Sequence, residues 1–349
     1  MIYVILVNWN GFRDTIECLE SLLRVDHHDI SVIVIDNAST DGSIDHIREW
    51  AEGFSTPSLT GPPWQYLPSR KKQDLTFDIV SWAAEFDDKR RFLTVIRADE
   101  NLGFAGANNL GMTYALKDRN ANFFWILNND TVVHPTAITP LETRMKTDKE
   151  IGIIGSRLMY YDTPTIVQGL GGWFSPYRAR GAHLGQGAIE TKLPDPKEVE
   201  RRQSYVIGAA MFVRRSVIEQ IGAMSDQYFL YFEELDWSMR LCGKFKLAYC
   251  QDSIVYHKEG ASIGASSSRK TNATRTYYLS VNLLRFFLMH YKIFIFFAIA
   301  RIFRECLSDI AKYDFHSVCI RMMAIKDFVT DRYRRGPISN VEFFNAKGN

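Results

Sequence analysis

Apolar residues follow two alternating spacings along the first 130 positions of the chain. Short, mostly apolar runs are typical of strands that are buried on both faces. Such strands are predicted at residues 2–7, 31–35, 92–96 and 123–127. Between these runs, apolar residues recur every three or four positions, as on one face of a helix. The helices are predicted around residues 16–23, 44–51 and 104–116. The alternation predicts an α/β fold with a mainly parallel sheet flanked by helices.

The pattern changes in the remaining segments. Residues 53–91 contain four prolines and a mixed charged stretch, which predicts an insertion at the edge of the sheet, with a surface loop and a short helix. Further short elements are expected as strands at 205–213, 246–249 and 253–256 and as a helix at 233–241. From about residue 274 to 333 the pattern is helical, and no internal repeat is evident.

Composition narrows the class of protein. The 349 residues exceed the usual single-domain size, and 46% hydrophobic with 23% charged residues is typical of a globular chain. A formal charge of +2, without a known nucleic-acid motif, gives no reason to expect a nucleic-acid partner. Five cysteines without C-x-x-C spacing indicate neither a disulfide framework nor a zinc site, so a reducing cytoplasm fits best. The N-terminal MIYVILVNWNG lacks the basic lead and the length of a signal peptide.

Polar residues follow each of the four predicted N-terminal strands. They are Asn8 and Asn10, Asp36 and Asn37, Asn101, and Asn128-Asn129-Asp130. Each alone is an ordinary turn residue, but in a parallel sheet the carboxyl ends of the strands form one ligand-binding edge. Asp36 has the chemistry to bind a nucleobase or ribose, and Asp130 to hold a divalent cation against a diphosphate. Both the G-x-G-x-x-G and the G-x-x-x-x-G-K-[ST] nucleotide motifs are missing.

Six segments in order resemble the family 2 glycosyltransferases of the GT-A fold, especially the rhamnosyltransferase-like branch. They are VNWNG, VIVIDNASTDGS, NLGFAGANN, WILNNDT, YFLYFEELDWSMR and IVYHKEGAS. The resemblance covers roughly residues 1–290 and implies a GT-A-type nucleotide-diphospho-sugar transferase fold with a helical C-terminal extension. The implied catalytic domain spans residues 1–270, with a nucleotide-sugar half (1–130) and an acceptor half (131–270). Residues 271–349 then form the helical C-terminal region.

The resemblance also implies a set of binding residues. Asp36 matches the acid that contacts the base of the nucleotide sugar. The other residues implied for nucleotide-sugar binding are Val7, Asn8, Asn101, Gly103, Asn108 and Asn129. Asp130 and His257 would hold Mn²⁺ or Mg²⁺. Asn128, which replaces the first acid of the family's D-x-D motif, would assist weakly or bind sugar or phosphate instead. An imidazole ligand suits Mn²⁺ better. The alternative for His257 is a hydrogen-bonded histidine at the end of a strand.

Three acids at residues 233–236 are candidates for the general base. Such acids are also ordinary at a helix start, but these follow a run of aromatic residues that would raise their proton affinity. The resemblance makes Glu234 the base, with Glu233 on the acceptor side. Asp236 and Trp237 would orient the acceptor or hold the helix, and Trp173 is a further predicted acceptor residue.

Basic residues after His257 are candidates for a lid over the phosphates, above all Arg269 and Arg275. Relatives often show Y-Y-x-x-R-N further on. This chain reads YYLSVN, with Val281 in the place of the arginine, so that role is lost or is supplied by Arg275 or Arg285.

The apolar stretch 286–303 is interrupted by His290, Lys292 and Arg301, which argues against a membrane-spanning helix. Basic residues among bulky apolar ones suit a helix in the interface of an anionic membrane. The alternatives are a helix packed on the catalytic domain and a homodimer contact.

Together these features predict a metal-dependent, inverting glycosyltransferase in surface polysaccharide synthesis, peripheral on the inner face of the cell membrane. The donor would be dTDP-rhamnose or a UDP-hexose, and the acceptor a hydroxyl of a glycan or lipid-linked saccharide. One alternative is a catalytically weak sugar-nucleotide-binding relative or scaffold, which Asn128 keeps open. A pyrophosphorylase is disfavoured because NWNGFRD lacks the glycine-rich basic loop that such enzymes need. A membrane-interaction protein with a vestigial nucleotide edge is disfavoured because every expected site carries polar residues.

Overall fold

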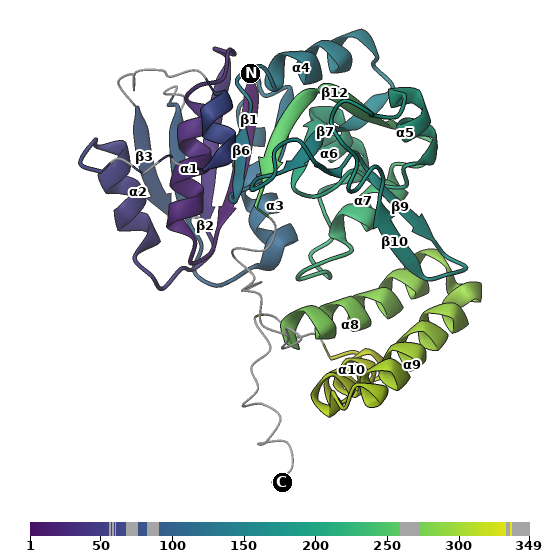
Figure 1. Cartoon of the computed structure of the whole chain (residues 1–349). Coiled ribbons are helices and arrows are strands. Elements are labelled where there is room, and N and C mark those ends of the chain that lie inside the picture. The colour runs from purple at the N-terminus through teal and green to yellow at the C-terminus, as the bar shows by residue number, and fades with distance from the viewer. Residues whose placement is uncertain are drawn as a thin grey trace.

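The computed structural model describes residues 1–55, 57, 59, 61–67, 76–81, 91–258, 273–332 and 336. A ten-stranded sheet forms the body of the molecule, with helices on both faces, and three helices form a group beside it (Figure 1). The strands are β1 Ile2–Asn8, β2 Ile30–Asp36, β3 Phe77–Ser81, β4 Leu93–Arg97, β5 Phe123–Asn128, β6 Thr131–Val133, β7 Ile151–Tyr160, β8 Val167–Gly169, β9 Gly172–Ser175, β10 Arg180–His183, β11 Ala210–Arg214 and β12 Lys246–His257. The helices are α1 Phe12–Leu22, α2 Ser43–Ala51, α3 Gly103–Leu116, α4 Ile138–Thr147, α5 Pro196–Arg202, α6 Arg215–Ile221, α7 Glu233–Arg240, α8 Ala273–His290, α9 Ile295–Ala311 and α10 Phe315–Val329, with short 3₁₀ turns η1 Pro62–Tyr66 and η2 Lys292–Phe294.

The four strands predicted in the first half are confirmed as β1, β2, β4 and β5. They pair in parallel within the strand order β3-β4-β2-β1-β5-β11-β7-β12-β6. Asn8 of β1 lies opposite Asp36 of β2, and Val7 lies opposite Asn128 of β5. The register therefore brings the carboxyl ends of three strands to one edge of the sheet.

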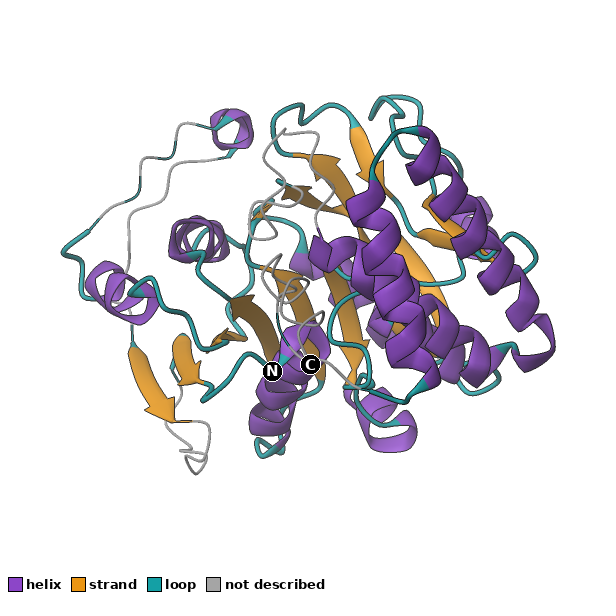
Figure 2. Cartoon of the chain, turned by 90° about the horizontal axis from the view of Figure 1, so that it is seen from below, coloured by secondary structure: helices purple, strands orange, loops and turns teal. Residues whose placement is uncertain are grey.

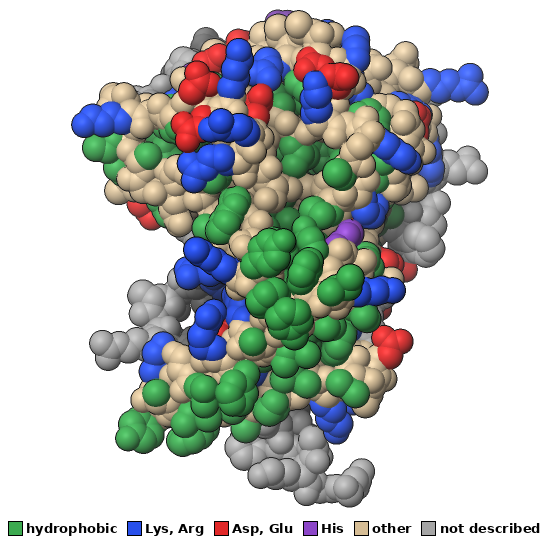
Figure 3. Space-filling view, turned by 90° about the vertical axis from the view of Figure 1, so that its right-hand side faces the viewer, with side chains coloured by type: hydrophobic (Ala, Val, Ile, Leu, Met, Phe, Trp, Pro, Cys, Tyr) green, Lys and Arg blue, Asp and Glu red, His purple; other side chains and the backbone are tan. Residues whose placement is uncertain are grey.

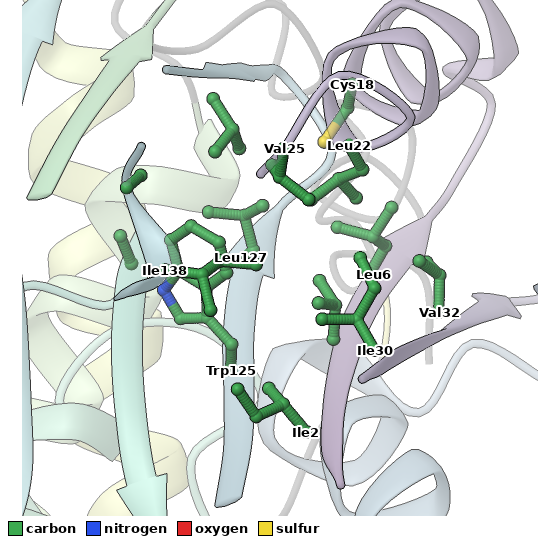
Figure 4. Close-up of a cluster of buried hydrophobic side chains, with 14 of the residues drawn as sticks. Ile2, Leu6, Cys18, Leu22, Val25, Ile30, Val32, Trp125, Leu127 and Ile138 are labelled. Carbon is green, nitrogen blue, oxygen red and sulfur yellow. The ribbon is translucent and has the colours of Figure 1, made fainter. Parts of the chain in front are cut away.

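Both faces of this parallel sheet are buried, as the continuous apolar runs predict. On one face, Leu6 and Leu127 pack against Cys18 and Leu22 of α1 (Figure 4). On the other face, Ile5 and its neighbours pack against α3. Successive side chains of a strand point to opposite faces, so a strand covered on both sides must be apolar throughout. This rigid support fixes the positions of the polar residues that follow each strand.

Three predicted elements differ from the structure. The 53–91 insertion supplies a strand as well as a short turn: β3 pairs in parallel with β4 at the edge of the sheet. The two strands expected at 246–249 and 253–256 are one strand, β12, whose register shifts between Cys250 and Ile254. The polar residues at that irregularity produce the sequence signal of a break. β11 starts later than expected, at Ala210, and runs antiparallel between β5 and β7.

The C-terminal helical prediction is confirmed by α8, α9 and α10, which Figure 2 shows grouped together. α8 packs on the body of the molecule: Phe286 and Phe287 share a buried cluster with Phe174 of β9 and Tyr228. In the described part of the chain, no helix is both long and apolar enough to cross a bilayer.

Candidate active site

A pocket of about 350 Å³ opens at the carboxyl edge of the parallel strands. Its walls come from the ends of β1, β2 and β5, the start of α3, the segments before β11 and α7, the end of β12 and the start of α8. The lining residues are Val7, Trp9, Asn37, Asn101, Gly103, Phe104, Leu127, Asn128, Asn129, Ile207, Gly208, Ala209, Phe229, Leu230, Tyr231, Glu233, Glu234, His257 and Thr274. Strand ends, Glu234 and His257 thus meet in one cavity, although Val7 and His257 lie at opposite ends of the catalytic part of the sequence.

Two residues predicted to bind the nucleotide lie behind this lining. Asn8 Nδ2 donates to Asp36 Oδ1 at 2.9 Å, and the backbone N–H of Ser39 donates to Asp36 Oδ2 at 3.2 Å. Asn8 is fully buried and Asp36 is 2% exposed. These two hydrogen bonds fix the Asp36 carboxylate behind the residues that line the pocket.

The start of α3 is fixed to the segment that precedes α7. Gly103 has φ +71, and a Cβ atom there would lie 2.3 Å from the carbonyl oxygen of Phe229. The Phe104 N–H donates to that same oxygen at 2.9 Å. Only glycine combines this left-handed backbone with so close an approach. Asn108, one turn further along α3, is 1% exposed and its Nδ2 donates to Phe104 O at 2.9 Å, so it supports the helix and does not line the pocket.

The pairing of β6 with β12 brings the predicted metal ligands together. His257 lies opposite Thr131, the residue after Asp130. His257 Nε2 is 3.1 Å from Asp130 Oδ1 and 3.3 Å from the Asn128 amide nitrogen, while its Nδ1 is 2.7 Å from Gln168 Oε1. Burial by itself would raise the pKa of Asp130, but the neighbouring His257 and Lys258 hold it below its usual range.

These residues suit a divalent cation. If the His257 Nδ1–H donates to Gln168, the Nε2 lone pair is available to a metal ion that the adjacent Asp130 carboxylate could also bind. A hydrogen-bond acceptor on the remote ring nitrogen is typical of metal-binding histidines. Among the described residues, no three His, Cys, Asp or Glu side chains gather as a metal site. The chain would thus supply Asp130 and His257 with the Asn128 amide, and diphosphate oxygens would complete the ligands.

Glu233 and Glu234 begin α7 after two residues in left-handed conformation. Tyr231 has φ +68 and Phe232 has φ +76. This turn aims the start of α7 at the pocket, where both glutamates line the wall. A Cβ atom on Gly208 would lie 3.9 Å from the Glu234 carboxyl carbon, so the absence of a side chain at Gly208 leaves room beside that carboxylate.

The two glutamates have different electrostatic environments. Burial and the adjacent Glu234 raise the pKa of Glu233 well above its usual value, and burial raises the pKa of Glu234. Oε2 of Glu233 is buried and lacks a hydrogen-bond partner among the described residues. Proton affinity raised in this way is what a carboxylate base near neutral pH requires.

Asp236 and Trp237 offer no surface to an acceptor. Both are fully buried: Asp236 binds Arg240 and His290, and the Trp237 Nε1–H donates to Gly222 O at 2.9 Å. Their burial argues against the first expected role, orienting the acceptor. It is consistent with the second, holding helix α7 in place. Trp173 lies on β9 and does not line the pocket.

The predicted lid is only partly described. Arg269 lies outside the described residues. Arg275 is exposed on the first turn of α8, next to Thr274 in the pocket wall. Burial raises the pKa of Tyr231, and the positive charge of Arg275 partly offsets that rise.

Several residues of the site have no clear sequence signal. Gln168 reaches His257 from β8, 89 residues away in the chain, and Ile207 and Gly208 enter the wall ahead of β11. Trp9 and Asn37 also line the pocket. They are adjacent to predicted residues, and their position directly after strands β1 and β2 could have indicated them.

Comparison with known proteins identifies the family. The family model "Glycosyl transferase family 2" matches residues 3–76 and 72–222, more than half of the chain. The chain belongs to glycosyl transferase family 2. The low-salt glycan biosynthesis hexosyltransferase Agl10 of Haloferax volcanii is 25% identical over 160 residues, 46% of this chain and 50% of that protein. The chain thus spans about half the length of this curated relative.

Solved structures bear on the fold. GalNAc-T7 with UDP, GalNAc and Mn²⁺ aligns with a TM-score of 0.52 at 15% identity, over 74% of this chain and 43% of its own. The mannosyltransferase PcManGT from Pyrobaculum calidifontis, in complex with GDP-Man and Mn²⁺, aligns with a TM-score of 0.49 at 13% identity. The alignment covers 99% of this chain and 79% of that one. The family match and the sheet architecture confirm the predicted GT-A-type fold. The rhamnosyltransferase-like branch stays a prediction.

Proposed function

We propose that this family 2 member is an inverting glycosyltransferase that moves a sugar from a nucleoside diphosphate donor to an acceptor hydroxyl. The observation that carries the proposal is the meeting of Glu234, His257 and the strand ends in one 350 Å³ pocket. In addition, the amide groups at the strand ends that line the pocket suit the polar groups of a nucleotide sugar, and a carboxylate with raised pKa lines the same pocket.

In the proposed reaction, Glu234 takes the proton of the acceptor hydroxyl. The acceptor oxygen forms a bond to the anomeric carbon, and the bond from that carbon to the diphosphate oxygen breaks, so the nucleoside diphosphate leaves with the electron pair. Asp130 and His257, with Asn128, would hold Mn²⁺ or Mg²⁺. Such a cation stabilises the negative charge on the departing diphosphate. We infer dTDP-rhamnose or a UDP-hexose as the donor, and a glycan or lipid-linked saccharide in surface polysaccharide synthesis as the acceptor.

A donor panel tests the assignment. The protein is mixed with Mn²⁺ or Mg²⁺, with dTDP-, UDP- and GDP-sugars and with lipid-linked saccharides, and nucleotide release and product mass are measured. We expect release with one class of donor and a product heavier by one sugar. Donor binding by calorimetry without turnover on any acceptor would favour the alternative, a non-catalytic nucleotide-sugar-binding relative, which Asn128 in place of an acid supports.

We also propose that the protein works at the inner face of an anionic membrane. Five apolar side chains of α9 recur at helical spacing and are 44–64% exposed: Phe296, Ile299, Phe303, Leu307 and Ile310. Figure 3 shows hydrophobic side chains gathered over the C-terminal helices, with Lys and Arg at the margins. An apolar stripe of this kind on a globular protein marks an interaction surface.

Charge favours a membrane over a second copy as the occupant. Both acids of α9 are paired, Glu305 with Arg301 and Arg321, and Asp309 with Arg321. The exposed Lys292, Arg304 and Lys312 have no acidic partner within the described residues. A symmetric dimer through this face would bring these cations together, whereas anionic lipid neutralises them.

Vesicle sedimentation tests this surface. We expect binding to vesicles that contain phosphatidylglycerol, weaker binding to phosphatidylcholine alone, and about 10-fold weaker binding for Phe303→Ser. Phe54→Ser removes an aromatic that is still more exposed, 81% against 64% for Phe303, from the segment after α2, and is the control. Equal binding of both variants, or a stable dimer in light scattering that Phe303→Ser dissociates, would contradict the membrane assignment.

A further inference from the structure

Helix α8 of the C-terminal region reaches the segment that carries the proposed base. Asn282 is fully buried, and its Nδ2 donates two hydrogen bonds, to Leu230 O at 2.9 Å and to Tyr231 O at 3.1 Å. Both acceptors belong to the stretch just before α7, and Leu230 and Tyr231 line the pocket. A side chain more than 45 residues away in sequence therefore holds the backbone from which Glu234 projects.

This backbone needs external support. Tyr231 and Phe232 are consecutive non-glycine residues with positive φ, a conformation that costs about 1–2 kcal/mol for each residue with a Cβ atom. Such strain persists only where the surroundings hold it in place. The two hydrogen bonds from Asn282 end on carbonyl groups at and directly before this strained pair, so they act where the chain would otherwise relax.

The orientation of the Asn282 amide is fixed. Its Oδ1 accepts a hydrogen bond from Arg285 Nη1 at 3.2 Å, which leaves both amide hydrogens for the loop. A second contact joins the same two helices: His290 Nε2 of α8 is 2.7 Å from Oδ1 of Asp236, one turn into α7. α8 thus holds α7 ahead of its first residue and again within it.

We propose that Asn282 is a positioning residue for Glu234, so that the C-terminal helical region is part of the catalytic machinery and not an appendage. The inference rests on the proposed function, because it assumes that Glu234 is the base. Asn282 itself touches no substrate in this account; it sets the direction of the first turn of α7.

The test compares Asn282 variants with a matched change on the same helix. Asn282→Asp keeps the size of the side chain but removes both donors, and Asn282→Ala removes them without a buried charge. Tyr277→Phe is the control, because it removes a buried hydrogen bond from α8 to Asp327 of α10 (2.9 Å) and leaves the loop untouched. All variants are assayed at a temperature at which near-ultraviolet circular dichroism shows them folded.

We expect both Asn282 variants to lower kcat about 10- to 100-fold, the penalty of a misplacement of about 1 Å, with donor KM changed less than about threefold. Tyr277→Phe should stay within about threefold in both constants. Amide hydrogen exchange across residues 229–236 should become at least about 10-fold faster in the Asn282 variants and should not change in the control.

Three results would overturn the inference: kcat within about threefold of wild type in both Asn282 variants, an equal loss in Tyr277→Phe, or unchanged exchange at 229–236. Failure of the proposed function is separate. It would show as wild-type silence across the donor panel, or as full activity of Glu234→Gln, and the exchange measurement would still decide whether Asn282 holds the loop.

Discussion

Replacement of Gly103 by alanine is expected to disturb both stability and catalysis. The new Cβ atom would lie 2.3 Å from Phe229 O, 2.8 Å from Phe229 Cδ2 and 3.0 Å from Phe229 C. Ordinary contact begins at 3.4 Å, so the backbone must retreat by about 1 Å. Because that backbone leads directly to the turn at Tyr231 and Phe232, the retreat should displace Glu234.

The structure sets the size of the effect. A left-handed conformation with a Cβ atom costs about 1–2 kcal/mol. Loss of the hydrogen bond from Phe104 N–H to Phe229 O adds about 1 kcal/mol. The free energy of unfolding should therefore fall by about 2–3 kcal/mol. For a chain of this length, this corresponds to a fall in Tm of about 3–4 °C.

Gly53→Ala is the matched control. Gly53 also has positive φ, +86, but nothing lies within 4 Å of the added Cβ atom. This variant should show the backbone strain alone, with a fall in Tm of about 1–3 °C and an unchanged rate. Gly103→Ala should in addition lower kcat about 100-fold, through the displacement of about 1 Å. Thermal melts and nucleotide-release rates measure both effects. Equal losses of Tm in the two variants, or a Gly103→Ala enzyme with wild-type kcat, would refute the reasoning.

Two further predictions concern the electrostatics of the pocket. The pKa of Glu233 is raised in the folded state. As pH rises from the unfolded value near 4.5 toward the folded value, the unfolded chain therefore loses this proton before the folded chain does. The free energy of unfolding should fall over that pH range. Glu233→Gln should flatten this fall in thermal melts across that range; parallel curves for the two proteins would argue against a strained acid pair. Gln168→Leu removes the partner of His257 Nδ1 and should weaken Mn²⁺-dependent nucleotide binding about 10-fold by calorimetry, while metal-free binding stays constant. Gln168→Glu keeps an acceptor for His257 Nδ1 and should bind almost as well as wild type. A loss as large as that of Gln168→Leu would show that Gln168 does not act by orienting His257.

The sequence predicts the parallel half of the fold well because its strands are buried on both faces. In such a strand almost every residue is apolar, as in 2–7 and 32–35, and the run is visible without knowledge of the partners. Edge and antiparallel strands give weaker signals. β3 is half-buried and only five residues long, and β12 carries polar residues at its register shift, which make one strand resemble two.

The sequence predicts those residues of the candidate site that lie at the ends of strands. Asn128 and His257 were expected near each other from the resemblance, and the pairing of β6 with β12 places them 3.3 Å apart. Burial is harder to predict. Asp236 and Trp237 resemble exposed residues of an acceptor site in sequence, but tertiary packing buries them completely. Gln168 and Asn282 reach the site by hydrogen bonds from distant parts of the chain, which no local pattern encodes.

Glu234 is the proposed base in a pocket for a nucleoside diphosphate sugar. The decisive measurement is that of kcat and donor affinity for Glu234→Gln beside wild type, with the reactive donor and Mn²⁺. We expect kcat to fall about 100- to 10,000-fold, the usual contribution of general base catalysis, while the donor dissociation constant changes little. Wild-type turnover by Glu234→Gln would show that Glu234 is not the base.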